Sequence, residues 1–197
     1  MTINQKKKIV IGVTGASGAI YAKKLMERLY MLNDQIASCG VIFSKAAREV
    51  WSYELQGEDF SNIPFKIFEP DNFFAPFASG SAGYDTMIIC PCSMGCMGRI
   101  ANGISGDLIS RAADVILKER GKLILVSRES PLNLIHIRNM ESITQAGGIV
   151  LPASPSFYAS VQTLDDAINT VVERILMLAG FQTKHFHWGE QEGYDFA

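Results

Sequence analysis

The side chains best suited to chemistry in this chain stand in short polar segments that directly follow apolar runs. The first segment, Thr14-Gly15-Ala16-Ser17-Gly18, comes after Ile9 to Val13. Its small residues would let a ligand approach the backbone, and a helix beginning there would offer free N–H groups and a positive dipole end. The segment therefore predicts a nucleotide-phosphate site, and the alternative is a tight turn that merely requires small residues.

The glycine spacing in this segment differs from the common dinucleotide and ATP patterns. Gly12, Gly15 and Gly18 are spaced G-x-x-G-x-x-G rather than G-x-G-x-x-G, and no G-x-x-x-x-G-K-[S/T] occurs. Phe43-Ser44-Lys45 stands where an acidic ribose ligand would follow the second strand. A dinucleotide or ATP is disfavoured and a mononucleotide such as FMN stays open. Ser44 could cap a helix and contact a phosphate at the same N-terminus.

Two charged residues follow another apolar run. Arg128 and Glu129 come just after Leu123 to Val126. Arginine suits a phosphate, and a partly desolvated glutamate suits proton transfer because burial raises its pKa toward neutrality. The alternative is an exposed ion pair in a loop. Further along, the stiff turn 152–157 delivers Tyr158, an aromatic side chain with a hydroxyl.

Three of the four cysteines are concentrated in Cys90-Pro91-Cys92-Ser93-Met94-Gly95-Cys96. Zinc would require C-x-x-C pairs or a nearby histidine, so a metal site is disfavoured. Buried, reduced thiols that pack as small hydrophobic groups are the default interpretation, and a nucleophilic cysteine is weakly supported because no histidine lies near in sequence. We expect Ser93-Met94-Gly95 to form a second small loop, rich in N–H groups, at the same crevice.

The elements that must position these segments are short strands alternating with helices. Their apolar residues are continuous rather than alternating, which is typical of parallel strands covered on both faces. The pattern predicts an α/β fold, a single-domain doubly wound parallel sheet in a Rossmann/flavodoxin-like three-layer αβα sandwich over residues 1–197, with flexible ends at 1–8 and 192–197. The binding crevice should lie beyond the carboxyl ends of the strands. Strands are predicted over 9–13, 37–43, 65–68, 86–90, 123–126 and 148–151, and helices over 22–32, 107–120 and 165–178.

Composition narrows the class of protein further. The 197 residues carry a formal net charge of −2, which removes the argument for nucleic-acid binding, and only 19% are charged. A typical share is about 25%, so part of the surface is expected to be covered by sister subunits. The cysteine usage favours a reducing cytoplasm. No apolar run approaches a membrane span, and Gly12 interrupts the run that follows Lys6-Lys7-Lys8 before a signal peptide can form.

Two aromatic segments fit the strand–helix scheme poorly. The loop 71–84 carries Phe73, Phe74 and Phe77, and the tail from Phe181 carries His185, Phe186, His187 and Trp188. We expect most of these rings to pack on a neighbouring subunit, with ligand contact as the alternative.

Taken together, these segments closely resemble the UbiX-type flavin prenyltransferases, a family related to the cysteine decarboxylases. Each motif alone is weak, but the set in this order is highly specific, and the resemblance runs from about Ile9 to Gln191. The motifs are Thr-Gly-Ala-Ser-Gly-Ala at 14–19, Cys-Pro-Cys-Ser-Met-Gly at 90–95, Arg-Ala-Ala-Asp-Val-x-Leu-Lys-Glu-Arg at 111–120, Arg-Glu-x-Pro-Leu at 128–132, Leu-Pro-Ala-x-Pro-x-Phe-Tyr at 151–158 and Trp-Gly-Glu-Gln at 188–191.

The resemblance implies a defined reaction. The family binds FMN and transfers the dimethylallyl group of dimethylallyl monophosphate to the reduced flavin, first at N5 and then at C6. The prenylated FMN serves a UbiD-type decarboxylase, often in ubiquinone biosynthesis. The family works without metal and forms large homo-oligomers, commonly dodecamers, with active sites between subunits. Fixed cations in a dry pocket would then do what Mg²⁺ and diphosphate do in other prenyltransferases.

The resemblance also implies roles for individual residues. Ser17 would lie near the flavin N5 and help to move its proton, Glu129 would protonate the leaving phosphate, and Arg111 and Glu54 match further catalytic positions. Trp188 and Tyr158 would offer aromatic faces to the developing allyl cation. The expected FMN-binding residues are Gly15, Ala16, Ser17, Ser44, Ser93, Met94, Gly95, Cys96 and Arg128. The expected substrate-binding residues are Lys118, Arg128, Tyr158, Arg174 and Trp188, and no metal ligand is expected.

Two other functions remain as alternatives. A cysteine decarboxylase would share the fold and FMN, but Gly95 replaces its asparagine and no histidine occurs before His136. A non-catalytic flavin-binding protein would not need an acid beside a phosphate clamp, so Glu129, Lys118 and Arg174 argue against it.

Overall fold

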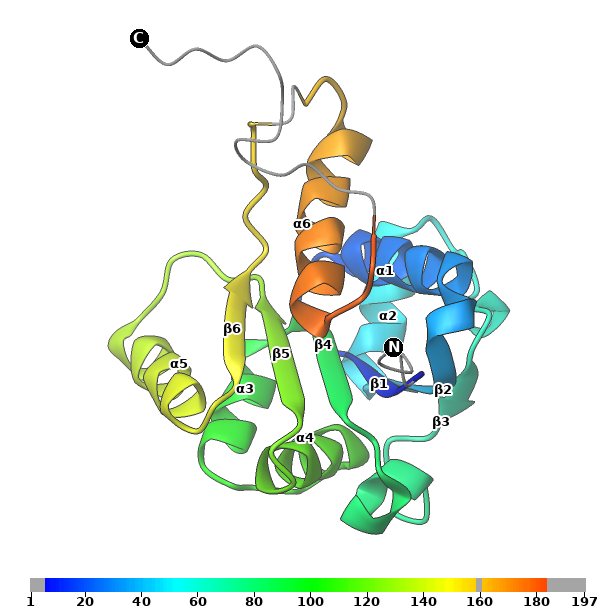
Figure 1. The fold of residues 1–197 in the computed structure, drawn as a ribbon. Helices are drawn as coiled ribbons and strands as arrows, with labels where there is room; N and C mark the ends of the chain where they lie inside the picture. The colour runs from blue at the N-terminus through cyan, green and yellow to red at the C-terminus, as the bar shows by residue number, and fades with distance from the viewer. Residues whose placement is uncertain (1–5, 159–160, 184–197) are drawn as a thin grey trace, which may run out of the picture.

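The computed structural model describes residues 6–158 and 161–183, and these contain one six-stranded parallel sheet. Six helices connect and cover the strands (Figure 1). The strands are β1 (Lys7–Val13), β2 (Ile36–Phe43), β3 (Lys66–Phe68), β4 (Thr86–Cys92), β5 (Lys122–Ser127) and β6 (Ile149–Pro152). The helices are α1 (Ala19–Met31), α2 (Lys45–Glu54), α3 (Met94–Ala101), α4 (Leu108–Lys118), α5 (Leu134–Gln145) and α6 (Leu164–Ala179).

The strand order is β3-β2-β1-β4-β5-β6, with every neighbouring pair parallel. This is the doubly wound order of Rossmann folds, and it confirms the predicted class. The order reverses at β1, where Ile11 pairs with Val41 on one side and with Ile88 on the other. Ligands of such sheets bind beyond the carboxyl ends of the strands at this switch point.

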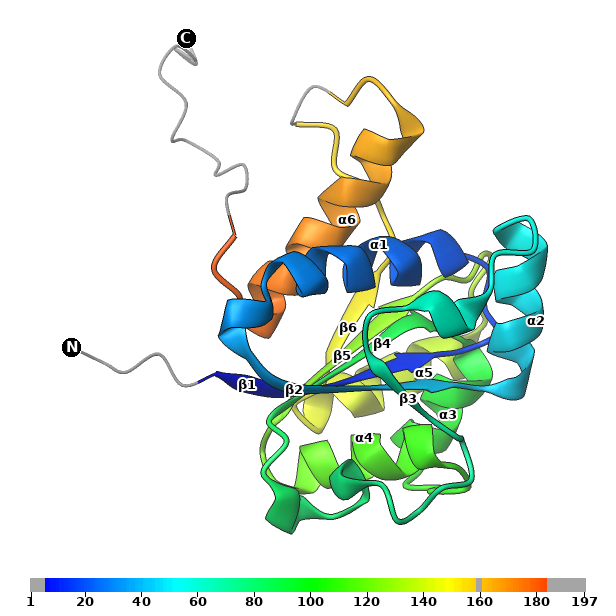
Figure 2. The same cartoon turned by 90° about the vertical axis from the view of Figure 1, so that its right-hand side faces the viewer.

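The helices form two layers, which Figure 2 shows above and below the sheet. On one face α1 and α6 pack Leu25, Leu29 and Ile175 into a buried cluster, and on the other face α3 and α4 pack Met97 and Ile109 into a second one. Helix α2 instead stands across the carboxyl ends of the strands (Figure 2). A helix in that position closes one side of the crevice.

The predicted strands agree with the observed ones to within a few residues. Strand β4 extends beyond its predicted end because Cys92 still pairs with Ser127. Asp107 and Thr163 cap α4 and α6, and Gly180 ends α6 with a φ of 80°. Helices α2, α3 and α5 were not predicted individually. Gly95 and Gly98 weaken the helical signal of α3.

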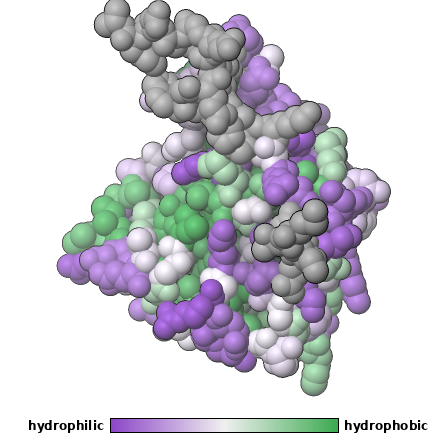
Figure 3. All heavy atoms as spheres, in the orientation of Figure 1, coloured by the Kyte–Doolittle hydropathy of each residue, from purple (hydrophilic) through white to green (hydrophobic). Residues whose placement is uncertain are grey.

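Helix α5 lacked a helical pattern for a different reason, because Ile143 is its only fully buried residue. Its exposed face carries Leu134, Ile135 and Ile137, between 50% and 68% exposed. Figure 3 shows hydrophobic side chains gathered on the side of the molecule where α5 and β6 lie. This surface is consistent with the expectation that sister subunits cover part of the chain.

The aromatic loop 71–84 divides into a buried and an exposed part. Phe77 is 1% exposed and packs its ring 4.9 Å from that of Phe68 and 5.3 Å from that of Tyr84. The prediction that this loop's rings pack on a neighbour is therefore wrong for Phe77, which belongs to the core. Phe74 is fully exposed and the prediction stays open for it. The tail residues His185 to Trp188 lie outside the described residues. Within the described ranges, no helix is both long and apolar enough to cross a bilayer.

Candidate active site

The loop after β1 presents backbone N–H groups at the switch point. Gly15 is required here, because a Cβ atom would lie 2.5 Å from the Cβ of Ala46 at the start of α2. The N–H groups of Gly15, Ala16 and Ser17 find no acceptor in the part of the chain that the structure describes. The Ser17 side chain is exposed. The loop therefore offers donors to a ligand, as the sequence predicted.

The N-terminus of α1 is closed by a carboxylate of the protein itself. Gly18, at φ 116°, is the N-cap and supplies no side chain. Glu54, the last residue of α2, accepts hydrogen bonds from Gly18 N at 2.9 Å and Ala19 N at 2.8 Å. The expectation that this helix N-terminus is free for a ligand phosphate is wrong, because Glu54 already occupies it.

Glu54 also links Ser17 to Arg128. Burial raises the pKa of this carboxyl, but the hydrogen bonds from the Ser17 hydroxyl and from Gly18 and Ala19, together with the charge of Arg128, outweigh burial and lower it. Arg128 Nε in turn donates to the carbonyl oxygen of Ser17 at 3.0 Å. The structure thus brings together three of the predicted site residues, Ser17, Glu54 and Arg128, around an ionised carboxylate.

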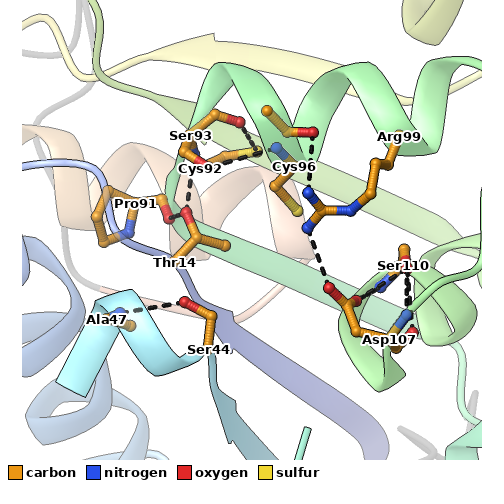
Figure 4. Close-up of polar contacts among 11 residues, drawn as sticks. Thr14, Ser44, Ala47, Pro91, Cys92, Ser93, Cys96, Arg99, Asp107 and Ser110 are labelled. Atoms are coloured by element: carbon orange, nitrogen blue, oxygen red, sulfur yellow. Dashed lines mark hydrogen bonds and ion pairs between the residues drawn. The ribbon is translucent and has the colours of Figure 1, made fainter. Parts of the chain in front are cut away.

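The N-termini of α2 and α3, in contrast, are open. Ser44 caps α2 by accepting from Ala47 N at 3.1 Å, and Ser93 caps α3 by accepting from Cys96 N at 3.3 Å (Figure 4). The capping role predicted for Ser44 is confirmed. Ser93-Met94-Gly95, expected as a loop, is instead the cap and first turn of a helix. Four N–H groups of these two turns have no acceptor among the described residues, those of Lys45, Ala46, Met94 and Gly95.

We call the three segments 15–17, 44–46 and 93–95 the cradle. A Cβ on Gly95 would meet nothing within 4 Å, so this side of the cradle is open. Each of these two helix N-termini provides unpaired N–H donors and the positive end of a helix dipole, which together suit an anion such as a phosphate. The residues present therefore fit the phosphate of a mononucleotide.

Thr14 lies between the loop and α3, and the sequence reasoning did not assign it a role. Its side chain is 4% exposed, and its hydroxyl contacts the connection between β4 and α3 (Figure 4). A threonine directly after an apolar run was the available signal, but it could not be separated from the small-residue turn around it.

The cysteines of the β4–α3 connection are free thiols and belong to the core. Cys90, Cys92 and Cys96 are at most 1% exposed. Burial raises the pKa of Cys90, and the hydrogen bond with Cys96 together with burial raises that of Cys92. The interpretation as buried, reduced thiols is confirmed. The thiol of Cys96 is buried and its N–H already donates to Ser93 Oγ, so neither group is left open, and the FMN contact expected of Cys96 stays a prediction.

Glu129 follows Arg128 and is exposed. Within the described residues its carboxylate accepts one hydrogen bond, from Ser130 N at 3.2 Å. The part of the chain that the structure describes therefore does not desolvate Glu129, contrary to the partial burial expected for it. Among the same residues it forms no ion pair, which was its alternative interpretation, and its role as a proton donor stays a prediction.

Two predicted cations lie on α4, away from the cradle. Arg111 donates through Nε to the carbonyl oxygen of Ala78 at 3.1 Å and pairs with Asp114. Lys118 ends α4 four residues before β5 begins, so it lies at the amino edge of the sheet, and it pairs with Glu119. Parallel strands place the cradle at the opposite edge. Neither cation reaches the cradle of its own chain.

The remaining predicted residues are less constrained. Arg174 is exposed on α6, with Nη1 3.7 Å from the sulfur of Met177. Tyr158 is 71% exposed, and Trp188 lies outside the described residues. Among the residues that the structure describes, no three His, Cys, Asp or Glu side chains gather as metal ligands would.

Comparison with protein families and curated proteins gives consistent matches. A family model described as Flavoprotein matches residues 2–176. The chain is 42% identical over 185 residues to the flavin prenyltransferase UbiX of Methanocaldococcus jannaschii, covering 92% of this chain and 98% of that protein. It is 37% identical over 202 residues to the flavin prenyltransferase UbiX of Pseudomonas aeruginosa, covering 94% and 95% of the two chains.

Solved structures agree with these matches. A UbiX protein crystallised with FMN and dimethylallyl pyrophosphate has a TM-score of 0.87 and 37% identity, covering 97% of this chain and 100% of that one. A dodecameric FMN-dependent UbiX-like decarboxylase from Escherichia coli has a TM-score of 0.84 and 34% identity, covering 91% and 98%. The peptidyl-cysteine decarboxylase EpiD, at 14% identity and a TM-score of 0.61 over 89% and 99%, shares the fold alone.

Proposed function

The chain belongs to the Flavoprotein family and, within it, to the UbiX flavin prenyltransferases, and from this premise we propose how its residues perform the reaction. The reaction transfers the dimethylallyl group of dimethylallyl monophosphate to reduced FMN. The observation that carries the proposal is the cradle, because its unpaired N–H groups at two helix N-termini suit the phosphate of FMN.

In this proposal the cradle holds FMN and orients it. Ser44, Ser93, Met94 and Gly95 bind the phosphate, while Gly15, Ala16 and Ser17 line the other side of the flavin. When bound in its reduced form, FMN supplies the nucleophilic N5 and C6 atoms that take the five-carbon group. Arg128, held by the Ser17 carbonyl, supplies a fixed positive charge beside them.

Ser17 and Glu54 are suited to moving a proton. The Ser17 hydroxyl lies beside the Glu54 carboxylate and helps to lower its pKa, so that the carboxylate is ionised near neutral pH. A hydroxyl in that arrangement can accept a proton from the flavin while it passes its own to Glu54. Glu129, exposed beside Arg128, protonates the phosphate as it leaves.

The phosphate of the second substrate needs more cations than one chain places near the cradle. Arg111 and Lys118 lie seven residues apart on α4, which puts them on one face of that helix. We propose that α4 of a neighbouring copy brings these two cations to the substrate phosphate, with Arg174 and Tyr158 as further ligands and Trp188 against the allyl group. The dodecameric relative and the exposed apolar face of α5 support an assembly of this kind.

We further propose that the prenylated FMN passes to a UbiD-type decarboxylase in the cytoplasm. The free state of the four cysteines supports a reducing compartment. No observation on the cradle favours the cysteine decarboxylase alternative, since Gly95 stands in place of the asparagine expected for it.

A direct assay tests the proposal. Protein loaded with FMN is reduced under anaerobic conditions and incubated with dimethylallyl monophosphate. The mass of the extracted flavin is then measured by mass spectrometry. We expect the flavin to gain one five-carbon unit. Glu129→Gln should bind FMN normally and lose roughly a hundredfold or more in transfer rate, while Glu141→Gln, an exposed glutamate on α5, should transfer normally. Flavin recovered unchanged from wild-type protein that binds it would overturn the proposed activity.

A further inference from the structure

Thr14 joins two segments of the cradle, 15–17 and 93–95, through a single buried hydroxyl. Its Oγ1 donates to the carbonyl oxygen of Pro91 at 2.7 Å and accepts from Ser93 N at 2.8 Å. Its backbone N–H donates to the same carbonyl at 3.2 Å. The side chain is 4% exposed, so water does not compete for these bonds.

These bonds continue the connection between β1 and β4 beyond the point where the strands can pair. The β1–β4 ladder ends at Gly12 and Ile89. Pro91 has no N–H and cannot donate to a ladder. The threonine hydroxyl connects the two segments at this point, because it can donate one hydrogen bond and accept another at the same time.

The hydrogen bonds of Thr14 join two segments that are expected to contact different parts of the ligand. Thr14 precedes Gly15, Ala16 and Ser17, the loop that lines the flavin side of the cradle. Ser93 is the N-cap of α3, and its neighbours Met94 and Gly95 carry the open N–H groups that suit a phosphate. A mononucleotide joins its phosphate to its ring covalently, so the turn that binds the phosphate and the loop that lines the ring must be held at a distance that the ligand can span.

We propose that Thr14 is a positioning residue that holds the phosphate-binding turn of α3 in register with the Ser17 loop. This inference rests on the proposed binding of FMN in the cradle and goes beyond the residues that contact it. Thr14 acts through Ser93 and the loop rather than by touching the ligand.

The test compares the binding of FMN with that of riboflavin, which lacks the phosphate. Thr14→Val keeps the shape of the side chain and removes the hydroxyl. We expect it to weaken FMN binding by roughly tenfold to a hundredfold, with a much smaller change for riboflavin, because the partly buried Ser93 N–H loses its acceptor and the turn shifts. Thr14→Ser keeps the hydroxyl and should restore the wild-type ratio of the two affinities.

Thr86→Val provides the matched control. Thr86 is 2% exposed near the other end of the sheet, and its hydroxyl donates to Asp85 Oδ1 at 2.6 Å. It should lower the melting temperature without changing the ratio of FMN to riboflavin affinity. The inference is overturned if Thr14→Val keeps the wild-type ratio, or if Thr86→Val changes it equally.

Two further outcomes keep the test decisive. If Thr14→Val does not fold, Thr14→Ser provides the test. A wild-type ratio of FMN to riboflavin affinity in Thr14→Ser supports the hydroxyl link, and a lowered ratio contradicts it. Wild-type protein that binds neither flavin would refute the proposed function itself. Because binding is measured without transfer, that failure is distinct from a failure of the inference.

Discussion

The two edges of the same sheet treat their polar groups in opposite ways. At the amino edge, Asp85 N donates to Lys8 O at 3.1 Å and Lys122 N donates to Asp85 O at 2.8 Å. The Asp85 carboxylate also accepts from Lys8 N and from the Thr86 hydroxyl. At the carboxyl edge, most N–H groups of the cradle have no acceptor among the described residues, and the exceptions are Ser44 N, which donates to Val13 O, and Ser93 N, which donates to Thr14 Oγ1. Polar groups that satisfy one another stabilise the fold, whereas donors left over can serve a ligand.

The comparison also divides the three helix N-termini at the carboxyl edge into two kinds. Glu54 occupies the start of α1, while the starts of α2 and α3 have only their serine caps. The same electrostatic feature is therefore satisfied within the chain at one helix and, in the proposed function, serves binding at the other two. Lys118 complicates this division, because a cation assigned to the substrate lies at the amino edge.

The largest predicted effect tests whether Lys118 serves the carboxyl edge of another copy. Lys118→Ala should lower kcat/KM by about a hundredfold or more, because a fixed charge on the leaving phosphate is lost. Co-expression of Lys118→Ala with Glu129→Gln should restore about one quarter of the wild-type activity if the two residues of each site come from different copies. The rate of flavin prenylation measures both results.

Lys66→Ala, on an exposed lysine at the sheet's outer strand, is the control and should remain active. Mixed assemblies that stay inactive would place Lys118 and Glu129 in the site of the same copy. Full activity of Lys118→Ala alone would remove Lys118 from the site altogether.

An intermediate effect is expected at Glu54, because this carboxylate accepts hydrogen bonds from the N–H groups at the start of α1. Glu54→Gln should lower the free energy of unfolding by about 1 kcal/mol at pH 7, since a charged cap of α1 is replaced by a neutral one. The folded-state pKa of Glu54 is lowered, so its stabilisation is fully present above the unfolded value of about 4.3 and is lost as the pH falls through the folded pKa.

Urea unfolding at pH 7 and at pH 3 measures this pH dependence. The difference in stability between wild type and Glu54→Gln should shrink at the lower pH. Glu49→Gln, on the same helix and exposed, should show no difference at either pH. If the difference in free energy of unfolding between wild type and Glu54→Gln is larger at pH 3 than at pH 7, the lowered pKa is contradicted.

The smallest effect is expected at the amino edge. Asp85→Asn retains one side-chain oxygen and so loses one of its two side-chain hydrogen bonds, which should cost about 0.5 kcal/mol. That corresponds to a fall of roughly 1–2 °C in melting temperature for a chain of this size. FMN affinity and transfer rate should not change. A change in either, measured by flavin titration, would show that the two edges are coupled.

Some of the molecule follows from local patterns in the chain. The six strands were predictable because continuous apolar runs are typical of parallel strands that are covered on both faces. Asp107 and Ser44 were recognisable as caps because a cap bonds groups within three residues. Helices α3 and α5 were not recognisable, since glycines weaken the propensity of one and exposure removes the apolar stripe of the other.

The segments that meet at the carboxyl edge were also determined by sequence, because parallel strands place all their carboxyl ends on one side. The sequence could not determine which polar groups at that edge bond to one another and which stay open to a ligand. Glu54 meets Gly18 across 36 residues, and Thr14 meets Pro91 across 77. Such pairs depend on how α2 and the β4–α3 connection pack in space, and no local propensity specifies that packing. The tertiary structure therefore decided which N–H groups remain open and placed Lys118 at the edge opposite to them.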